Sequence, residues 1–157
     1  MCGIVALYAS GPVNQRLYDA LLLLQHRGQD AAGICTVEGR YFHMHKGMGL
    51  VRDVFRTRNM RDLLGNCGIG QVRYPTQGNA TAADESQPFY VNAPFGIVLA
   101  HNGNLVNSFE LRQALETEGS IFHTTSDTEV ISYIITKERI RSGSIEEAVN
   151  LSLIHIS

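Results

Sequence analysis

The order of hydrophobic patterns along the chain is the feature that most constrains its fold. Short apolar runs of strand length fill the first two thirds of the sequence, and apolar residues at helical spacing dominate the last third. Strands followed by packed helices are typical of an α+β architecture built in layers. No internal repeat, low-complexity tract or linker interrupts these patterns. We therefore predict one domain with a layered α+β fold.

The predicted strands are short and bounded by turn residues. Apolar runs predict strands over residues 3–8, 31–37, 40–45 and 68–73. Glu38-Gly39 is the expected turn between the second and third strands. A hairpin is predicted from residues 89–91 and 95–100.

Helices are predicted from apolar spacing and from capping residues. A first helix is expected to open at Pro12 and to stop near Gly28, with Leu17 and Leu21 on its apolar face. Residues 51–64 predict one or two short helical turns. Capping patterns of the Ser/Thr/Asx-x-x-Glu type occur at 107–110, 126–129 and 144–147.

The composition excludes several classes of protein. A formal net charge of -2 and a pI near 6.3 give no basic face for nucleic acid. No apolar run approaches the ~20 residues that span a bilayer, and the first residues lack the basic leader of a signal peptide. The sequence therefore predicts a cytoplasmic protein without nucleic-acid or membrane partners.

Most of the potentially reactive side chains have a simple structural interpretation. The three cysteines are odd in number and widely spaced, which is a poor framework for disulfides or a metal. Cys35 and Cys67 are expected to be buried thiols within strands. The pair His43 and His45 has no third ligand nearby, so a surface pair is favoured over a metal site. Asp84 and Glu85 are expected to be solvated.

Cys2 differs from the other cysteines because of its position. Initiator methionine is usually removed before a small side chain, which would make Cys2 the first residue. A free α-amine has a pKa of about 7.7–8.0 and can accept the thiol proton directly or through one water. Nucleophile and base would then belong to one residue, as in N-terminal threonine nucleophiles.

Four further motifs, taken together with the N-terminal residues, resemble a known family of enzymes. They are His26-Arg27-Gly28-Gln29-Asp30-Ala31-Ala32-Gly33, Arg73-Tyr74-Pro75-Thr76, His101-Asn102-Gly103-Asn104 and Thr125-Ser126-Asp127. Together with Met1-Cys2-Gly3-Ile4-Val5, and in this order, they resemble the class II glutamine amidotransferases. The resemblance implies a layered αββα sandwich of the N-terminal-nucleophile hydrolase type, truncated at its C-terminus.

Within that class the chain is similar to the amidophosphoribosyltransferases. The similar stretches are residues 24–30 and 72–76. Glucosamine-6-phosphate synthases carry a tyrosine-rich first motif and a tryptophan after the arginine, whereas this chain has Gln25-His26 and Tyr74. The resemblance covers residues 2 to about 150.

The resemblance assigns catalytic roles to three residues. Cys2 would attack the side-chain amide of glutamine, and the tetrahedral oxyanion that forms needs preorganised donors. The Asn102 side-chain amide and the Gly103 backbone N–H match the family's oxyanion hole. An Asn-Gly hairpin turn is the alternative, and it is less favoured because a helical pattern follows.

Substrate-binding roles follow in the same way. Arg73 would grip the α-carboxylate of glutamine with two N–H groups, with Tyr74 beside it and Thr76 as a further donor. Asp127 would receive the α-ammonium, although a first-turn helix residue stabilised by the helix dipole is an open alternative. Arg27 would lie near the N-terminal amine in a positioning role.

The resemblance implies hydrolysis of glutamine to glutamate and ammonia. The ammonia would pass to phosphoribosyl pyrophosphate to give 5-phosphoribosylamine, in the first step of purine biosynthesis. The acidic pair and phosphate loop that bind this acceptor do not occur in the sequence. We therefore expect a missing second domain that binds it with magnesium, no cofactor or metal in this domain, and a homo-oligomeric parent.

Two alternatives to this function remain open. The chain could serve another acceptor, as in the glucosamine-6-phosphate synthase or asparagine synthetase type, or it could be a catalytically inert glutamine-binding module. In either case the expected domain spans residues 2–150 and is incomplete at its C-terminal end. Residues 151–157 depart from the family and resemble a translated linker, so we expect a non-native tail there.

Overall fold

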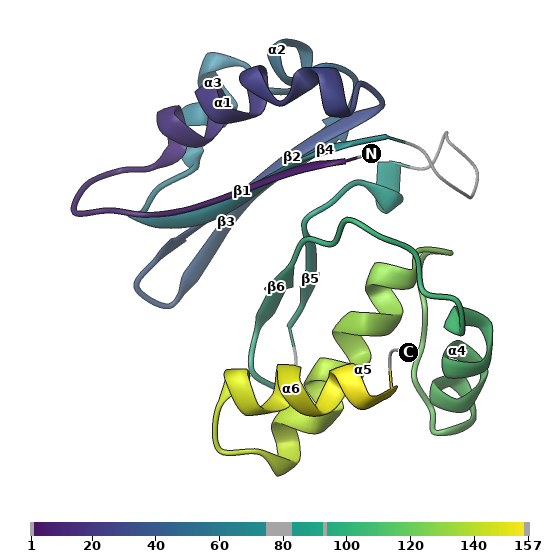
Figure 1. The fold of residues 1–157 in the computed structure, drawn as a ribbon. Helices are drawn as coiled ribbons and strands as arrows, with labels where there is room; N and C mark the ends of the chain where they lie inside the picture. Colours follow the sequence, from purple (N-terminus) through teal and green to yellow (C-terminus); the bar gives the residue numbers. More distant parts are fainter. Residues whose placement is uncertain (1, 75–82, 93, 156–157) are drawn as a thin grey trace. The chain divides into compact units, whose positions relative to one another are not determined.

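The chain forms two compact units. A computed structural model describes residues 2–74, 83–92 and 94–155 (Figure 1). The first unit comprises the chain up to Pro88 together with residues 100–102, and the second comprises residues 89–99 and the chain from Gly103 onward. The sequence patterns do not mark this division, because the chain passes between the units three times.

A four-stranded antiparallel sheet forms the centre of the first unit. Its strands are β1 (Gly3–Tyr8), β2 (Ala31–Glu38), β3 (Tyr41–Met48) and β4 (Cys67–Arg73), in the order β1-β4-β2-β3. All four predicted strands are confirmed. The predicted turn between β2 and β3 is also confirmed, and Gly39 has a positive φ of 61° there, which glycine adopts without strain.

Helices cover one face of this sheet (Figure 1). They are α1 (Asn14–Leu23), α2 (Val51–Val54) and α3 (Thr57–Asp62), and two 3₁₀ turns lie elsewhere in the unit, η1 (Gln25–Arg27) and η2 (Ala83–Glu85). Leu17 and Leu21 are fully buried as predicted. Two glycines on β4 allow these leucines to approach the strand closely. A Cβ at Gly68 would lie 2.9 Å from Leu17 Cδ1, and a Cβ at Gly70 would lie 3.0 Å from Leu21 Cδ1.

The second unit contains a hairpin and three helices. β5 (Phe89–Val91) pairs antiparallel with β6 (Ile97–Leu99), which confirms the predicted hairpin. The helices are α4 (Ser108–Thr117), α5 (Asp127–Arg141) and α6 (Ile145–His155). α5 packs through two apolar stripes, one with Val130 and Ile134 and one with Ile131 and Ile135. Residues 151–155 continue α6, and the origin of this segment stays a prediction.

The three predicted caps have different outcomes. Ser126 Oγ accepts from Thr128 N at 3.2 Å and Ser144 Oγ accepts from Glu147 N at 3.2 Å, so the serine half of each of these two patterns is confirmed. The cap at Asn107 is wrong. Its side-chain amide instead donates to His155 O at 2.9 Å, a partner too distant in sequence for a local pattern to reveal.

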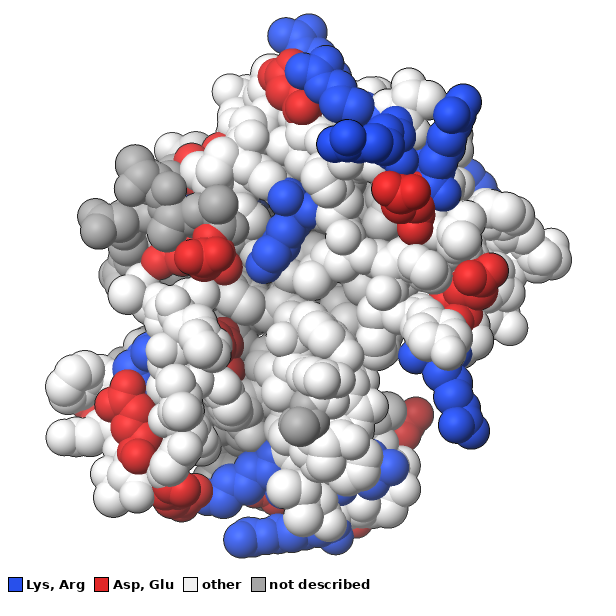
Figure 2. Space-filling view, turned by 180° about the vertical axis from the view of Figure 1, so that it is seen from behind, with Lys and Arg blue, Asp and Glu red and all other residues white. Residues whose placement is uncertain are grey.

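The surface carries both signs of charge. Figure 2 shows basic side chains beside acidic ones rather than a broad face of one sign. Across the described part of the chain, none of the helices combines the length and apolar character needed to cross a membrane.

Candidate active site

Cys2 lies directly before β1 and is 9% exposed. In the antiparallel ladder Gly3 pairs with Val72, which brings Cys2 to the end of β4. Its thiol faces the peptide of Tyr74. The Tyr74 N–H donates to Cys2 Sγ at 3.4 Å, and the thiol can donate to Tyr74 O at 3.7 Å. Both contacts use main-chain atoms of Tyr74, so the contribution of this residue to the thiol comes from its backbone.

Two side chains donate to the carbonyl oxygen of Cys2. Arg27 Nε lies 3.1 Å from Cys2 O, and Asn102 Nδ2 lies 3.0 Å from the same atom. Arg27 comes from η1, whereas Asn102 comes from the short return of the chain into the first unit. The structure thus brings together four residues that the sequence selected, namely Cys2, Arg27, Tyr74 and Asn102.

Arg73 lies at the end of β4 and is 8% exposed. One guanidinium nitrogen contacts Asp30 Oδ2 at 2.8 Å, and the other contacts Glu85 Oε2 at 2.6 Å. Such charge-assisted bonds fix the plane of the guanidinium group. Arg73 is therefore held in one orientation by two acidic side chains.

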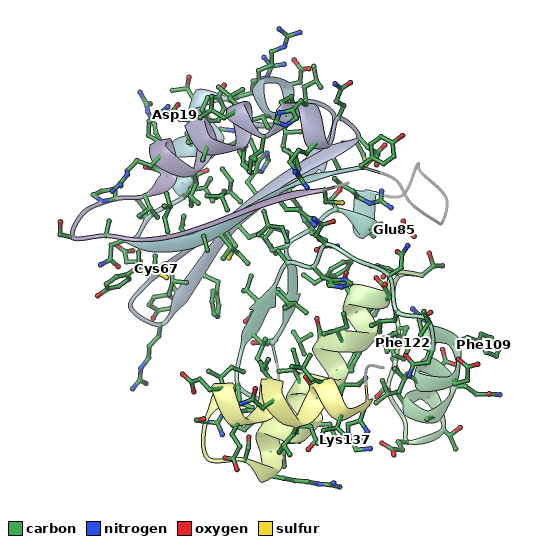
Figure 3. The ribbon with its side chains drawn as sticks, viewed as in Figure 1. Asp19, Cys67, Glu85, Phe109, Phe122 and Lys137 are labelled. Carbon is green, nitrogen blue, oxygen red and sulfur yellow. The ribbon has the colours of Figure 1, made fainter. Side chains whose placement is uncertain are left out.

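The expectation that Glu85 is solvated is wrong. Glu85, labelled in Figure 3, is 4% exposed because it pairs with Arg73. Asp84 is exposed, as expected. Two adjacent carboxylates give no sequence signal for which one is buried, so only the position of Arg73 could have distinguished them.

The main chain of Arg73 is held as closely as its side chain. The Asp30 N–H donates to Arg73 O at 3.1 Å. A Cβ at Gly28 would lie 2.6 Å from the carbonyl carbon and oxygen of Arg73. Gly28, the first glycine of the segment 26–33, is therefore required by a close approach of two backbones.

The remaining predicted site residues are not in the described part of the first unit. Gly103 and Asp127 belong to the second unit. Within that unit Asp127 begins α5, and its Oδ2 accepts from Leu105 N at 2.8 Å. Asp127 therefore ties the segment after Gly103 to the start of a helix. Thr76 lies outside the described residues.

The other thiols differ in environment from Cys2. Cys35 is 2% exposed on β2, and burial raises the pKa of its thiol to about 11. A thiol with so high a pKa is almost entirely protonated at neutral pH and is a poor nucleophile. Cys67 lies on β4 but is partly exposed, so the expectation that its thiol is buried is wrong. Within the described residues, no group of three or more His, Cys, Asp or Glu side chains could hold a metal ion.

Comparison with known proteins gives consistent results. A family described as a glutamine amidotransferase domain matches residues 77–150. An amidophosphoribosyltransferase of Escherichia coli (strain K12) is 56% identical over 140 residues, which are 88% of this chain and 28% of that protein. The amidophosphoribosyltransferase of Methanocaldococcus jannaschii is 44% identical over 156 residues, which are 98% of this chain and 33% of the relative.

A solved structure shows the same fold. The glutamine phosphoribosylpyrophosphate amidotransferase from B. subtilis superposes with a TM-score of 0.85 at 37% identity, covering 100% of this chain and 33% of that one. The predicted layered α+β class is confirmed. The chain spans 33% or less of the length of the relatives named here. Sequence and fold therefore agree that this chain is similar to part of the amidophosphoribosyltransferases, and that its residues 77–150 match a glutamine amidotransferase domain.

Proposed function

We propose that this domain hydrolyses glutamine to glutamate and ammonia, with Cys2 as the nucleophile. The observation that carries the proposal is the setting of Cys2, whose thiol faces a peptide N–H and whose carbonyl is held by Arg27 and Asn102. Removal of Met1 frees the α-amine, which takes the thiol proton. The sulfur attacks the side-chain carbonyl of glutamine, ammonia leaves with that proton, and water hydrolyses the thioester to glutamate.

The neighbours of Cys2 have complementary tasks in this mechanism. The Tyr74 N–H, 3.4 Å from Sγ, can donate to the sulfur as it becomes negative. An asparagine amide has two N–H groups. One of those on Asn102 holds Cys2 O, and the second is left to donate to the oxyanion, with the Gly103 N–H as the other donor. Preorganised donors of this kind supply much of the stabilisation of such a transition state.

Recognition of glutamine follows from its two charged groups. A guanidinium group has five N–H donors in a rigid fork. Two of its nitrogens already contact Asp30 and Glu85, which orients the rest of the fork. We propose that Arg73 binds the α-carboxylate with help from Tyr74 and Thr76, and that Asp127 binds the α-ammonium.

For the complete protein we propose transfer of the ammonia to phosphoribosyl pyrophosphate. The names of the relatives, which span about three times the length of this chain, support this acceptor. Magnesium would accompany the pyrophosphate in the part of the protein that lies outside this chain. Thiol, amine and water suffice for the glutaminase step itself. We further propose a cytoplasmic homo-oligomer that binds neither nucleic acid nor membranes.

Covalent labelling tests the nucleophile and the base together. A diazoketone analogue of glutamine should alkylate Cys2 alone, and mass spectrometry of the N-terminal peptide should show Met1 removed. Cys35 should stay unlabelled because its thiol, with a pKa of about 11, is protonated and buried. Labelling at a different cysteine would refute the nucleophile. Full glutaminase activity with Met1 retained would refute the amine as base.

Substitution of Arg73 tests substrate recognition. Arg73→Lys keeps a positive charge beside Asp30 and Glu85, so the protein should fold. It should nevertheless raise KM for glutamine at least tenfold, because an ammonium cannot reproduce the fork. Arg73→Ala should raise KM further and also lower the melting temperature, since it removes the guanidinium that pairs with buried Glu85 and partly buried Asp30. Arg61→Lys, on the exposed side of α3, is the control. An unchanged KM in both Arg73 variants would exclude this role.

A further inference from the structure

Two buried glutamine side chains bind the main chain of His101, one at its N–H and the other at its carbonyl oxygen. Gln71 Nε2 donates to His101 O at 2.7 Å, and His101 N donates to Gln87 Oε1 at 2.7 Å. Gln71 is 1% exposed and Gln87 is 8% exposed. The two amides thus bind residue 101 as a neighbouring β-strand would, although residue 101 is not in a strand. Asn102, which contacts Cys2, is the next residue.

The segment that carries Gln87 is itself fixed. Lys46 Nζ on β3 donates to Ser86 O at 2.6 Å and to Pro88 O at 3.4 Å, on either side of Gln87. On β2, Gly33 leaves the space that the Gln87 carbonyl oxygen fills, because a Cβ there would overlap that oxygen. The main chain that carries the acceptor for the His101 N–H is therefore anchored on both sides of Gln87.

Gln71 has a feature that stability alone does not explain. It lies on β4, which is paired on both edges, and its Oε1 has no hydrogen-bond partner among the described residues. A buried acceptor without a partner destabilises the fold. An apolar side chain of similar size would avoid this destabilisation. The feature that glutamine offers and an apolar side chain lacks is the N–H that it donates to His101 O.

We infer that Gln71 and Gln87 are positioning residues that set the place of the Asn102 amide beside Cys2. The inference rests on the proposed function, in which Asn102 donates to the oxyanion. By holding residue 101 at both its N–H and its carbonyl, the two side chains limit rotation of the main chain that leads into Asn102. Misplacement of a donor by about 1 Å can lower a rate about a hundredfold, so this restraint bears directly on turnover.

Gln71→Met in the complete protein is the first test. The variant keeps the length of the side chain and loses its donor. We expect kcat for glutamine hydrolysis to fall at least tenfold while KM stays within about twofold, the pattern for an interaction that acts in the transition state. The melting temperature should change little, because the lost bond is offset by removal of the unpartnered Oε1. The rate at which iodoacetamide alkylates Cys2 should not change, since this reagent needs no oxyanion donor.

Two substitutions of Gln87 exploit the direction of its hydrogen bond. Gln87→Met removes the acceptor for the His101 N–H and should lower kcat as Gln71→Met does. Gln87→Glu replaces the amide oxygen with a carboxylate oxygen, which can still accept from the His101 N–H, and should recover most of the loss seen with Gln87→Met. The control is Gln15→Met, which changes an exposed glutamine on α1 and should leave all constants unchanged.

The outcomes separate this inference from the proposed function. Normal kcat in both Gln71→Met and Gln87→Met would overturn the inference, as would equal loss in Gln87→Met and Gln87→Glu. If Gln71→Met does not fold, the Gln87 pair decides the question. If Asn102→Ala retains full kcat, the assignment of Asn102 fails first, whatever the glutamine variants show.

Discussion

Replacement of Cys2 by alanine should abolish glutamine hydrolysis and leave ammonia-dependent synthesis by the complete protein intact. Cleavage of the amide passes through a bond to sulfur in the proposed mechanism, whereas added ammonia bypasses that step. The packing around residue 2 should survive, because Arg27 and Asn102 bind its carbonyl oxygen rather than its side chain. Assays with glutamine and with ammonium salts, run on the same preparation, measure both activities.

Cys35→Ala is the matched control for this result. Cys35 is buried on β2, and its thiol has a pKa of about 11, so it should contribute nothing to the chemistry. Both activities should persist in that variant. Glutamine hydrolysis that survives in Cys2→Ala would place the nucleophile elsewhere. Loss of both activities in Cys2→Ala would instead indicate that the substitution disturbs the fold, which a melting curve would reveal.

Asn102→Ala should lower kcat for glutamine hydrolysis by about 10²–10³, the usual loss for one oxyanion donor. Asn102 also holds the carbonyl of Cys2 at 3.0 Å, so the loss should lie toward the upper end of that range. Asn102→Asp keeps the size of the side chain but replaces its donor with a negative charge. It should be at least as damaging, because the charge repels the oxyanion. Steady-state kinetics with glutamine give both constants.

Asn92→Ala, an exposed asparagine between β5 and β6, is the control for these variants. A change confined to KM in Asn102→Ala would show that Asn102 binds the ground state and the transition state equally. The carbonyl of Cys2 would then be its main partner, and the oxyanion would require another donor.

Sequence patterns predicted the local structure well and the tertiary contacts poorly. The four strands of the first unit and the β5–β6 hairpin follow from apolar runs and turn residues. The capping pattern at 126–129 was right in one half only. Ser126 accepts the Thr128 N–H, but the carboxylate of Glu129 accepts from His123 and Thr124 instead of reaching back to Ser126. The pattern 126–129 alone does not show that N–H groups outside it, those of His123 and Thr124, compete for the carboxylate of Glu129.

The candidate site shows the same limit. The motifs selected Cys2, Arg27 and Asn102, which the structure brings together. The motifs did not identify Glu85, because its partner Arg73 lies 12 residues away. Gln71 and Gln87 were missed for a related reason. A glutamine in a strand or a loop is usually solvated, and only the fold shows that these two contact the main chain of the same residue, His101.

The position of β4 has a consequence for how activity is lost on heating. β4 pairs with β1 on one edge and with β2 on the other, and it carries Gln71 and Arg73. Exposure of these side chains requires the hydrogen bonds to both β1 and β2 to break. A residue on an edge strand is exposed when the hydrogen bonds to a single neighbouring strand break. Fraying, which begins at termini and loops, therefore leaves this part of the site assembled. Thermal inactivation that originates here would coincide with cooperative melting of the whole sheet.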